Sequence, residues 1–192
     1  MKNIVLTSCG VRNEDFKNEF YKIISKQELF HKKVLYITTA SDGEEGDKSW
    51  MDIEFQTMLE LGMQKDNITE YKIGESDIDI DKYDIMYMMG GNTFYLLDRI
   101  RKNNFEKEIN GFIDQNKIYI GSSAGSEILG NSIEIALPYD ENKVNMTDYT
   151  GLKIIDGFVI PHANRKEEFV KDLKNKTKDK IILLYDDDGI IV

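Results

Sequence analysis

The sequence has little cysteine, and it lacks long hydrophobic runs; each shortage excludes a class of protein. A single cysteine, Cys9, among 192 residues excludes an intrachain disulfide framework and a zinc site built on clustered cysteines, and it indicates a reducing compartment. No apolar stretch approaches the roughly 20 residues that a membrane-spanning helix needs, and the N-terminus lacks the core of a signal peptide. We therefore predict a cytoplasmic protein without a membrane partner.

Basic residues and prolines are also scarce. The chain has 25 Lys and Arg against 35 Asp and Glu, a formal net charge of −10, and such a surface repels phosphate backbones. We therefore expect no nucleic-acid partner. With only two prolines and no Pro/Gly/Ser-rich linker, the sequence has no sign of a boundary, and we predict a single domain over residues 1–192.

What is present is an alternation of short apolar runs with stretches of helical spacing. Several runs are apolar at consecutive positions, which is typical of strands buried on both faces. The alternation predicts an α/β fold with three layers, a mostly parallel sheet flanked by helices. The predicted strands are Asn3–Thr7, Lys33–Thr39, Ile68–Ile73, Ile85–Met89, Ile118–Gly121, Phe158–Pro161 and Ile181–Tyr185, and the predicted helices are Asn13–Lys26, Trp50–Leu61, Thr93–Arg101, Phe105–Gln115 and Lys166–Lys176. Alternating apolar residues in Ser132–Gly157 predict a hairpin or excursion added to the edge of the sheet.

A candidate nucleophile follows one of these strands. Gly121-Ser122-Ser123-Ala124-Gly125 matches G-x-S-x-G between a predicted strand and a predicted helix, the context in which this pattern carries a nucleophilic serine. Small-residue turns of this kind also arise by chance, but the context favours Ser123 as a nucleophile. Since ligand sites of open α/β sheets lie at the carboxyl ends of the strands, its partners should follow other strands.

A serine hydroxyl needs a base to accept its proton, and the usual base is histidine. His162 directly follows a predicted strand and so belongs to the same edge as Ser123, whereas His31 precedes a strand and is expected to be a surface residue. The two histidines have no metal-ligand spacing, and the mechanism needs no metal, so we predict neither a metal nor another cofactor.

The sequence also contains candidates for two other parts of a serine-hydrolase site, the oxyanion hole and the acid that orients the histidine. The backbone N–H groups of Ala124 and Gly91 are candidates for an oxyanion hole, because each follows a strand in a glycine turn. A carboxylate should orient the histidine. The chain order serine, acid, histidine would place it in the excursion, at one of Glu134, Asp140, Glu141, Asp148 and Asp156.

Three segments in this order resemble the peptidase E family of serine peptidases: Gly90–Leu97 (Gly-Gly-Asn-Thr-Phe-Tyr-Leu-Leu), Gly121–Ser126 (Gly-Ser-Ser-Ala-Gly-Ser) and Pro161-His162. The resemblance spans nearly the whole chain. It implies a flavodoxin-like sheet related to class I glutamine amidotransferases, and hydrolysis of small peptides after an N-terminal aspartate.

By that resemblance Ser123 is the nucleophile, His162 is the base, and Gly91 and Ala124 are the oxyanion donors. The family's acid falls at about Asp140, with Glu134 as the alternative. An aspartyl substrate requires cationic or amide donors, for which Arg12, Asn92 and Arg165 are the candidates.

Two further hypotheses stay open at this stage. The same machinery can act on another acyl substrate, as an amidase or isopeptidase. The chain can also be a binding or sensing protein that has kept the fold with weak or no turnover. Labelling of Ser123 by a serine-directed phosphonate separates this protein from an enzyme, because the reaction requires an activated hydroxyl.

Overall fold

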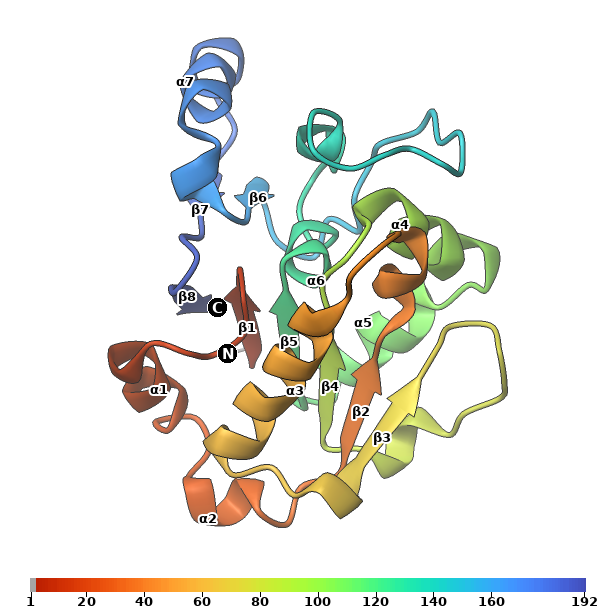
Figure 1. Ribbon diagram of the computed structural model, residues 1–192, viewed down its shortest axis with the longest axis vertical. Coiled ribbons are helices and arrows are strands. Elements are labelled where there is room, and N and C mark those ends of the chain that lie inside the picture. Colours follow the sequence, from red (N-terminus) through yellow and green to blue (C-terminus); the bar gives the residue numbers. More distant parts are fainter. Residues whose placement is uncertain (1–2) are drawn as a thin grey trace.

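The computed structural model describes residues 3–192 and contains a six-stranded central sheet with the strand order β3-β2-β4-β5-β1-β8 (Figure 1). Five of these strands are parallel, and β8 pairs antiparallel with β1. Their bounds are β1 Ile4–Thr7, β2 Val34–Ile37, β3 Ile68–Tyr71, β4 Ile85–Met88, β5 Ile118–Ser122 and β8 Gly189–Ile191. The prediction of a mostly parallel sheet is confirmed.

Helices cover both faces of this sheet. They are α1 Glu14–Phe20, α2 Lys26–Leu29, α3 Ser49–Leu61, α4 Thr93–Lys102, α5 Glu106–Asp114, α6 Ala124–Glu127 and α7 Glu167–Lys176. Short 3-10 turns are found at η1 Thr39–Gly43, η2 Lys65–Asn67, η3 Ile80–Lys82, η4 Glu134–Ala136 and η5 Ala163–Arg165. The long helix predicted over residues 13–26 ends at Phe20, and a separate helix, α2, begins after a capping box at Ser25.

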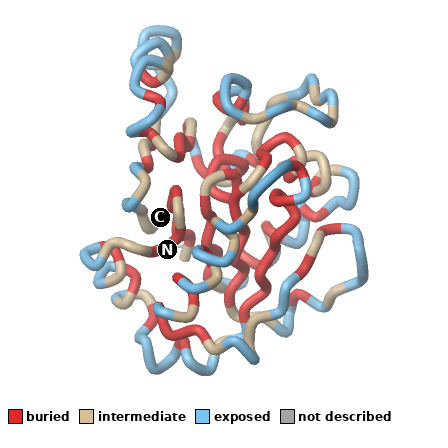
Figure 2. The backbone as a smooth tube through the Cα atoms, viewed as in Figure 1, coloured by how far each residue is buried: buried red, intermediate tan, exposed pale blue. Residues whose placement is uncertain are grey.

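The strands divide their side chains between two hydrophobic cores. On β2, Leu35 and Ile37 pack with α4 and α5, while Val34 and Tyr36 pack with α1 and α3. This division follows from the two-residue period of a strand, which sends successive side chains to opposite faces. Figure 2 shows the result as a buried sheet inside a more exposed layer of helices and loops.

A second, small sheet pairs β6 (Phe158–Ile160) with β7 (Ile181–Leu183) in parallel. Its residues Val159 and Ile182 belong to the same hydrophobic core as the α4 and α5 side of the main sheet. Both strands were predicted from the sequence, but their separation from the main sheet was not. Because β6 and β7 are parallel neighbours, the residues after them, including His162 and Asp186, lie side by side.

The segment between α6 and β6 does not form the predicted hairpin at the edge of the sheet. Residues 134–136 form the turn η4, and a single antiparallel bridge joins Ser132 to Thr150. The segment instead runs to the start of α4, where Asp140 Oδ2 accepts a hydrogen bond from Thr93 N at 2.7 Å. The apolar alternation of Ile133 and Ile135 therefore reflects two buried positions and not a strand. Among residues 3–192, no helix is long and apolar enough to cross a membrane.

Candidate active site

Ser123 lies in a tight turn between β5 and α6, where its backbone has φ 47° and ψ −111°. This left-handed conformation is costly for a residue with a side chain, and it is typical of an exposed nucleophile between a strand and a helix. The flanking glycines make the turn possible. A Cβ on Gly121 would lie 2.6 Å from Gly125 O, and a Cβ on Gly125 would lie 2.1 Å from Met88 O.

Side chains beneath this turn hold it against β1. Ser126 Oγ accepts a hydrogen bond from Thr7 N at 3.0 Å and lies 2.8 Å from Gly121 O. Ser123 N donates to Thr7 O at 2.9 Å. These buried contacts fix the strained turn, so that the Ser123 hydroxyl has one position relative to the sheet.

His162 follows β6 and points its Nε2 at Ser123 Oγ, at a distance of 3.0 Å. Its backbone is left-handed, with φ 55°, and its N–H donates to Ser8 Oγ at 3.0 Å, which ties the loop to the end of β1. Burial lowers the pKa of His162, and the hydrogen bond and charge of Asp186 oppose this shift. The imidazole is therefore neutral at pH 7 and able to accept the serine proton.

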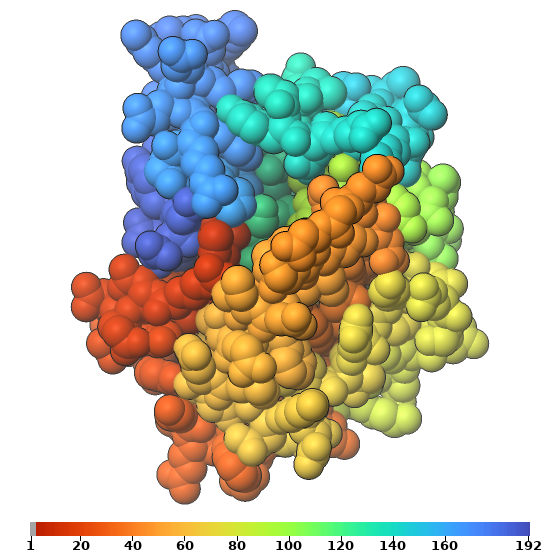
Figure 3. Space-filling view, viewed as in Figure 1, coloured from red at the N-terminus to blue at the C-terminus, as the bar shows by residue number. Residues whose placement is uncertain are grey.

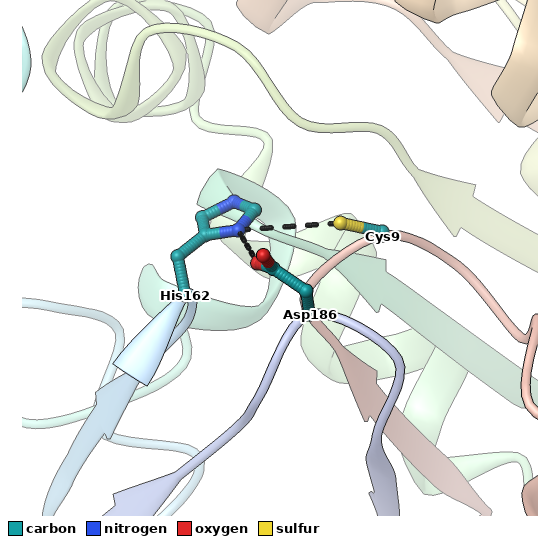
Figure 4. Close-up of side chains that lie close together, drawn as sticks. All are labelled: Cys9, His162 and Asp186. Atoms are coloured by element: carbon teal, nitrogen blue, oxygen red, sulfur yellow. Dashed lines mark hydrogen bonds and ion pairs between the residues drawn. The ribbon is translucent and has the colours of Figure 1, made fainter. Parts of the chain in front are cut away.

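Asp186 follows β7 and contacts the opposite nitrogen of the imidazole, with 2.6 Å between its Oδ1 and His162 Nδ1 (Figure 4). Its Oδ2 accepts from Asn164 Nδ2 at 2.9 Å and from Arg165 Nε and Nη2 at 2.9 and 2.7 Å. Burial raises the pKa of this carboxyl, but the hydrogen bonds from Asn164, His162 and Arg165 outweigh it and lower the pKa to about 2. Asp186 is therefore ionised at neutral pH and fixes the Nδ1–H tautomer, the one in which Nε2 accepts a proton.

The acids predicted from the sequence do not contact His162, although Asp140 lines the same pocket, so this part of the prediction was wrong. Asp140 caps the first turn of α4 through Thr93 N, and Glu134 is exposed and does not line the pocket around Ser123. The carboxylate that contacts His162 follows it in the chain. The prediction failed because it assumed the order serine, acid, histidine, whereas the parallel pairing of β6 with β7 supplies the acid from the C-terminal segment.

The two glycine turns predicted to form an oxyanion hole are adjacent. A Cβ on Gly90 would lie 3.0 Å from Ser123 Cβ, so the turn after β4 lies directly beside the nucleophile. Within residues 3–192, neither Gly91 N nor Ala124 N donates a hydrogen bond. Both N–H groups remain free for an oxygen at this position, which keeps them candidates for stabilising an oxyanion.

Of the predicted substrate-binding residues, Asn92 and Arg165 are engaged by the protein itself. Asn92 is 2% exposed; its Oδ1 accepts from Tyr95 N and its Nδ2 donates to Glu141 O, both at 2.9 Å. Asn92 therefore caps α4, and its amide has no free end for a substrate. Arg165 donates two hydrogen bonds to Asp186 Oδ2, which is the arrangement of a residue that positions the acid.

Arg12 is different, because it lines the pocket without a partner. The pocket has a volume of about 540 Å³ and is bounded by the ends of β1, β4 and β5, by α3 and by the segment around Tyr139. Figure 3 shows the hollow between α3 and the C-terminal segments. Within the described residues Arg12 has no hydrogen bond or ion pair, and its Nε is buried. Arg12 is half-buried, and its charge interacts with the buried Glu54 of the same pocket, but a guanidinium with unpaired N–H groups is still a ready site for a carboxylate.

The side chain of Glu127, which lines the same pocket, also lacks a hydrogen-bond partner among the described residues. This residue is 2% exposed, and its Oε1 has no hydrogen-bond partner within residues 3–192. Burial raises the pKa of Glu127, the Lys166 charge opposes this rise, and the Asp140 charge adds to it. Lys166 lies over the Tyr139 ring, with 4.5 Å from its Nζ to the ring centroid; its charge acts on Glu127, but no ion pair joins the two among residues 3–192. Sequence reasoning missed Glu127, since one acid among 35 carries no signal of its burial.

Serine, histidine and aspartate are thus connected in a line, with two free N–H groups beside the serine. In this arrangement His162 can take the proton of Ser123, and Asp186 can stabilise the resulting imidazolium. The two N–H groups can receive the negative charge of a tetrahedral intermediate. This is the chemistry of acyl transfer to a serine. One group of described residues also has the donor atoms of a metal site, namely Cys9, His162 and Asp186.

Comparison with known proteins agrees with the class of protein that this fold and site define. The family model described as peptidase family S51 matches residues 4–192, and the chain belongs to this family of serine-type peptidases. The resemblance to peptidase E and the expected amidotransferase-like fold are confirmed.

Individual relatives have similar names. An "uncharacterized peptidase" of Listeria monocytogenes is 33% identical over 168 residues, which cover 85% of this chain and 79% of the relative. A second "uncharacterized peptidase", from Pasteurella multocida, is 30% identical over 69% of this chain and 65% of its own length. A crystal structure of a "putative peptidase E protein" from Listeria monocytogenes superposes with a TM-score of 0.83 at 28% identity, covering all of this chain and 94% of the other. A peptidase from an acI-B1 actinobacterium shares the fold at a TM-score of 0.64 and 19% identity, over 98% of this chain and 82% of the other.

Proposed function

We propose that this chain is a cytoplasmic, single-domain serine exopeptidase that hydrolyses small peptides after an N-terminal aspartate. The observation that carries the proposal is the continuous line from Ser123 Oγ through His162 to Asp186, with contacts of 3.0 and 2.6 Å, at the edge of a pocket that holds an unpaired arginine. Membership of family S51 supports the peptidase chemistry. The preference for aspartate rests on Arg12 and on the resemblance to peptidase E.

In the proposed mechanism Ser123 Oγ attacks the scissile carbonyl carbon while His162 Nε2 takes its proton. The carbonyl oxygen becomes an oxyanion and accepts hydrogen bonds from Gly91 N and Ala124 N. His162 then returns the proton to the leaving amine, and the C–N bond breaks to give an acyl-enzyme on Ser123. Water attacks this ester with His162 again as the base, which releases the acid and restores the serine. Asp186 stays ionised throughout and stabilises the imidazolium.

Arg12 is the residue we assign to the aspartyl side chain. It follows β1, and it lines the same pocket as Ser123. Its unpaired N–H groups fit a planar carboxylate, and desolvation within the pocket strengthens such a pair. Because Asn92 and Arg165 are already bonded to other protein groups, Arg12 is the predicted polar residue still free to bind substrate.

Glu127 is the residue we assign to the free α-ammonium group of the substrate. In an exopeptidase that removes one residue, this group is two bonds from the carbonyl carbon that the serine attacks, so its partner must lie near the nucleophile. Glu127 is four residues beyond Ser123, about one helical turn of 5.4 Å along α6. A buried carboxyl without a hydrogen-bond donor is stabilised when an ammonium group supplies one.

The test is release of a chromogenic amine from aspartyl, leucyl and alanyl amides, with Ser123→Ala as the control. We expect selective turnover of the aspartyl amide and a loss of about a thousandfold to a millionfold in Ser123→Ala, as for triad serines elsewhere. Full activity in Ser123→Ala would overturn the proposed nucleophile. Equal turnover of all three amides would leave the nucleophile and overturn the aspartyl preference. If none of the three is hydrolysed but a side-chain amide assayed beside them is, the chain is an amidase or isopeptidase.

A further inference from the structure

Cys9 lies against the catalytic residues but has no part in the proposed hydrolysis. It follows β1, and its Sγ is 4.0 Å from His162 Nδ1, the nitrogen that also contacts Asp186 (Figure 4). The thiol is on the side of the imidazole away from Ser123, outside the path of the serine proton. The donor atoms of Cys9, His162 and Asp186 all lie within 4.8 Å of one another.

A thiolate, an imidazole and a carboxylate form a donor set that suits Zn²⁺ and similar thiophilic divalent cations, and not Mg²⁺ or Ca²⁺. Tetrahedral Zn²⁺ holds sulfur and nitrogen ligands about 3.6 Å apart, and nitrogen and oxygen ligands about 3.3 Å apart. The Sγ–Nδ1 and Nδ1–Oδ1 separations are 4.0 and 2.6 Å, and Sγ and Oδ1 lie within 4.8 Å of each other, so shifts on the order of 1 Å bring all three atoms to zinc-binding distances. Asn164 and Arg165 already hold the second oxygen of Asp186, as outer partners of a metal ligand do.

We propose that Cys9, His162 and Asp186 form an inhibitory site for Zn²⁺, which switches off Ser123 by imposing the wrong tautomer on His162. On binding, the metal forms bonds to Cys9 Sγ, His162 Nδ1 and Asp186 Oδ1, and water completes its coordination. The thiol proton leaves to solvent, and the Nδ1 proton moves to Nε2. Nε2–H then donates to Ser123 Oγ and is unable to accept its proton, so the nucleophile loses its base.

This site cannot be recognised in the sequence, because its residues are at positions 9, 162 and 186 and lack the short spacing of a metal-binding motif. The fold assembles it because the ends of β1, β6 and β7 meet beside Ser123. Ser8, the neighbour of Cys9, helps to hold this junction by bonding to both His162 N and Leu184 O. The proposal does not depend on the identity of the peptide substrate.

The first experiment titrates Co²⁺, a spectroscopic substitute for Zn²⁺, into chelator-treated Ser123→Ala protein, so that no activity is required. Since Cys9 is the chain's single cysteine, a sulfur-to-cobalt charge-transfer band reports this residue alone. We expect a band that saturates at one Co²⁺ per chain, that Zn²⁺ removes by competition, and that Cys9→Ser abolishes. Absence of the band at saturating Co²⁺ would overturn the proposal.

The second experiment measures Zn²⁺ inhibition of hydrolysis in the wild type, Cys9→Ser and Glu45→Gln, with unfolding midpoints to verify folding. Glu45 lines the same pocket, is exposed, and controls for cations held by the pocket's acids. We expect Cys9→Ser to keep its activity and to need more than about tenfold more Zn²⁺ for half inhibition, while Glu45→Gln behaves as the wild type. Equal sensitivity of Cys9→Ser and wild type would place the inhibitory cation elsewhere and overturn the proposal.

Discussion

The two sides of the pocket differ in how their polar groups are partnered. On the side of β6 and β7, His162 contacts both Ser123 and Asp186, and Asp186 accepts hydrogen bonds on both oxygens. On the other side, Arg12 Nε and Glu127 Oε1 are buried without partners. Buried polar groups are nearly always satisfied, so two unsatisfied ones in the same pocket are candidates for groups that bind a ligand. In the proposed function, this difference separates the residues that act on the peptide bond from the residues that select the peptide.

Replacing Asp186 by Asn removes the partner of His162, and among the substitutions that compare the two sides of the pocket it should have the largest effect on turnover. An amide donates to Nδ1 and so favours the imidazole tautomer that carries its proton on Nε2. We expect kcat to fall by about ten-thousandfold with little change in KM, measured on the aspartyl amide. Asp140→Asn is the matched control, because an asparagine at that position can still accept from Thr93 N and cap α4. A large loss in Asp140→Asn with near-normal Asp186→Asn would reverse our assignment of the acid.

Replacing Arg12 by Gln removes one of the two unpaired groups of the pocket. It should change which peptide is preferred and leave kcat nearly unchanged. Losing a charge-assisted hydrogen bond to the substrate carboxylate should raise KM for the aspartyl amide by about ten- to a hundredfold, while the poor leucyl and alanyl amides react as before. Steady-state kinetics on the three amides measure this directly. If Arg12→Gln keeps its aspartyl preference, another cation, such as Lys166, holds the side chain.

Replacing Glu127 by Gln tests the other unpartnered group. A neutral amide oxygen accepts more weakly than a carboxylate from the substrate ammonium, so KM for the aspartyl amide should rise by about tenfold. The N-acetylated amide has no ammonium group, and the variant should treat it as the wild type does. Glu134→Gln, on an exposed acid outside the pocket, is the matched control. An equal change for both substrates would show that Glu127 has a structural role only.

The smallest expected effect is a shift in the pH profile. Because burial lowers the pKa of His162, kcat/KM should rise through an apparent pKa below 6.5 and be level at neutral pH. The positive charge of Arg165 also lowers the pKa of His162. Arg165→Gln should therefore move the acid limb of the profile to higher pH. A shift to lower pH would mean that Arg165 acts on His162 mainly through Asp186.

Much of the fold was predictable, because strands buried on both faces are apolar without alternation. The bounds of β4 and β5 were predicted to within a residue. The short strand β8 was missed, since Gly189–Ile191 gives too few residues for a pattern. Of the hairpin or excursion predicted for Ser132–Gly157, the hairpin was wrong, because the buried Ile133 and Ile135 belong to a 3-10 turn and its approach and not to a strand.

The residues of the candidate site also differ in whether a local sequence pattern could identify them. Ser123 and His162 were found because each stands directly after a strand in a recognisable local motif. Asp186 also follows a predicted strand, so the same rule would have found it had the assumed chain order and the resemblance to peptidase E not directed attention to Asp140. The burial of Glu127 and the pairing of Arg165 depend on contacts that are distant along the chain, and no local pattern in the sequence reports them.

The most direct test of the account is the rate at which a serine-directed phosphonate labels Ser123 in the wild type, Asp186→Asn and Asp140→Asn, followed by mass spectrometry of the intact chain and its peptides. Labelling requires an activated hydroxyl and no particular peptide side chain. We predict near-stoichiometric labelling at Ser123 in the wild type and in Asp140→Asn, and much slower labelling in Asp186→Asn. Absence of labelling in the wild type, or slow labelling in Asp140→Asn alone, would contradict the account.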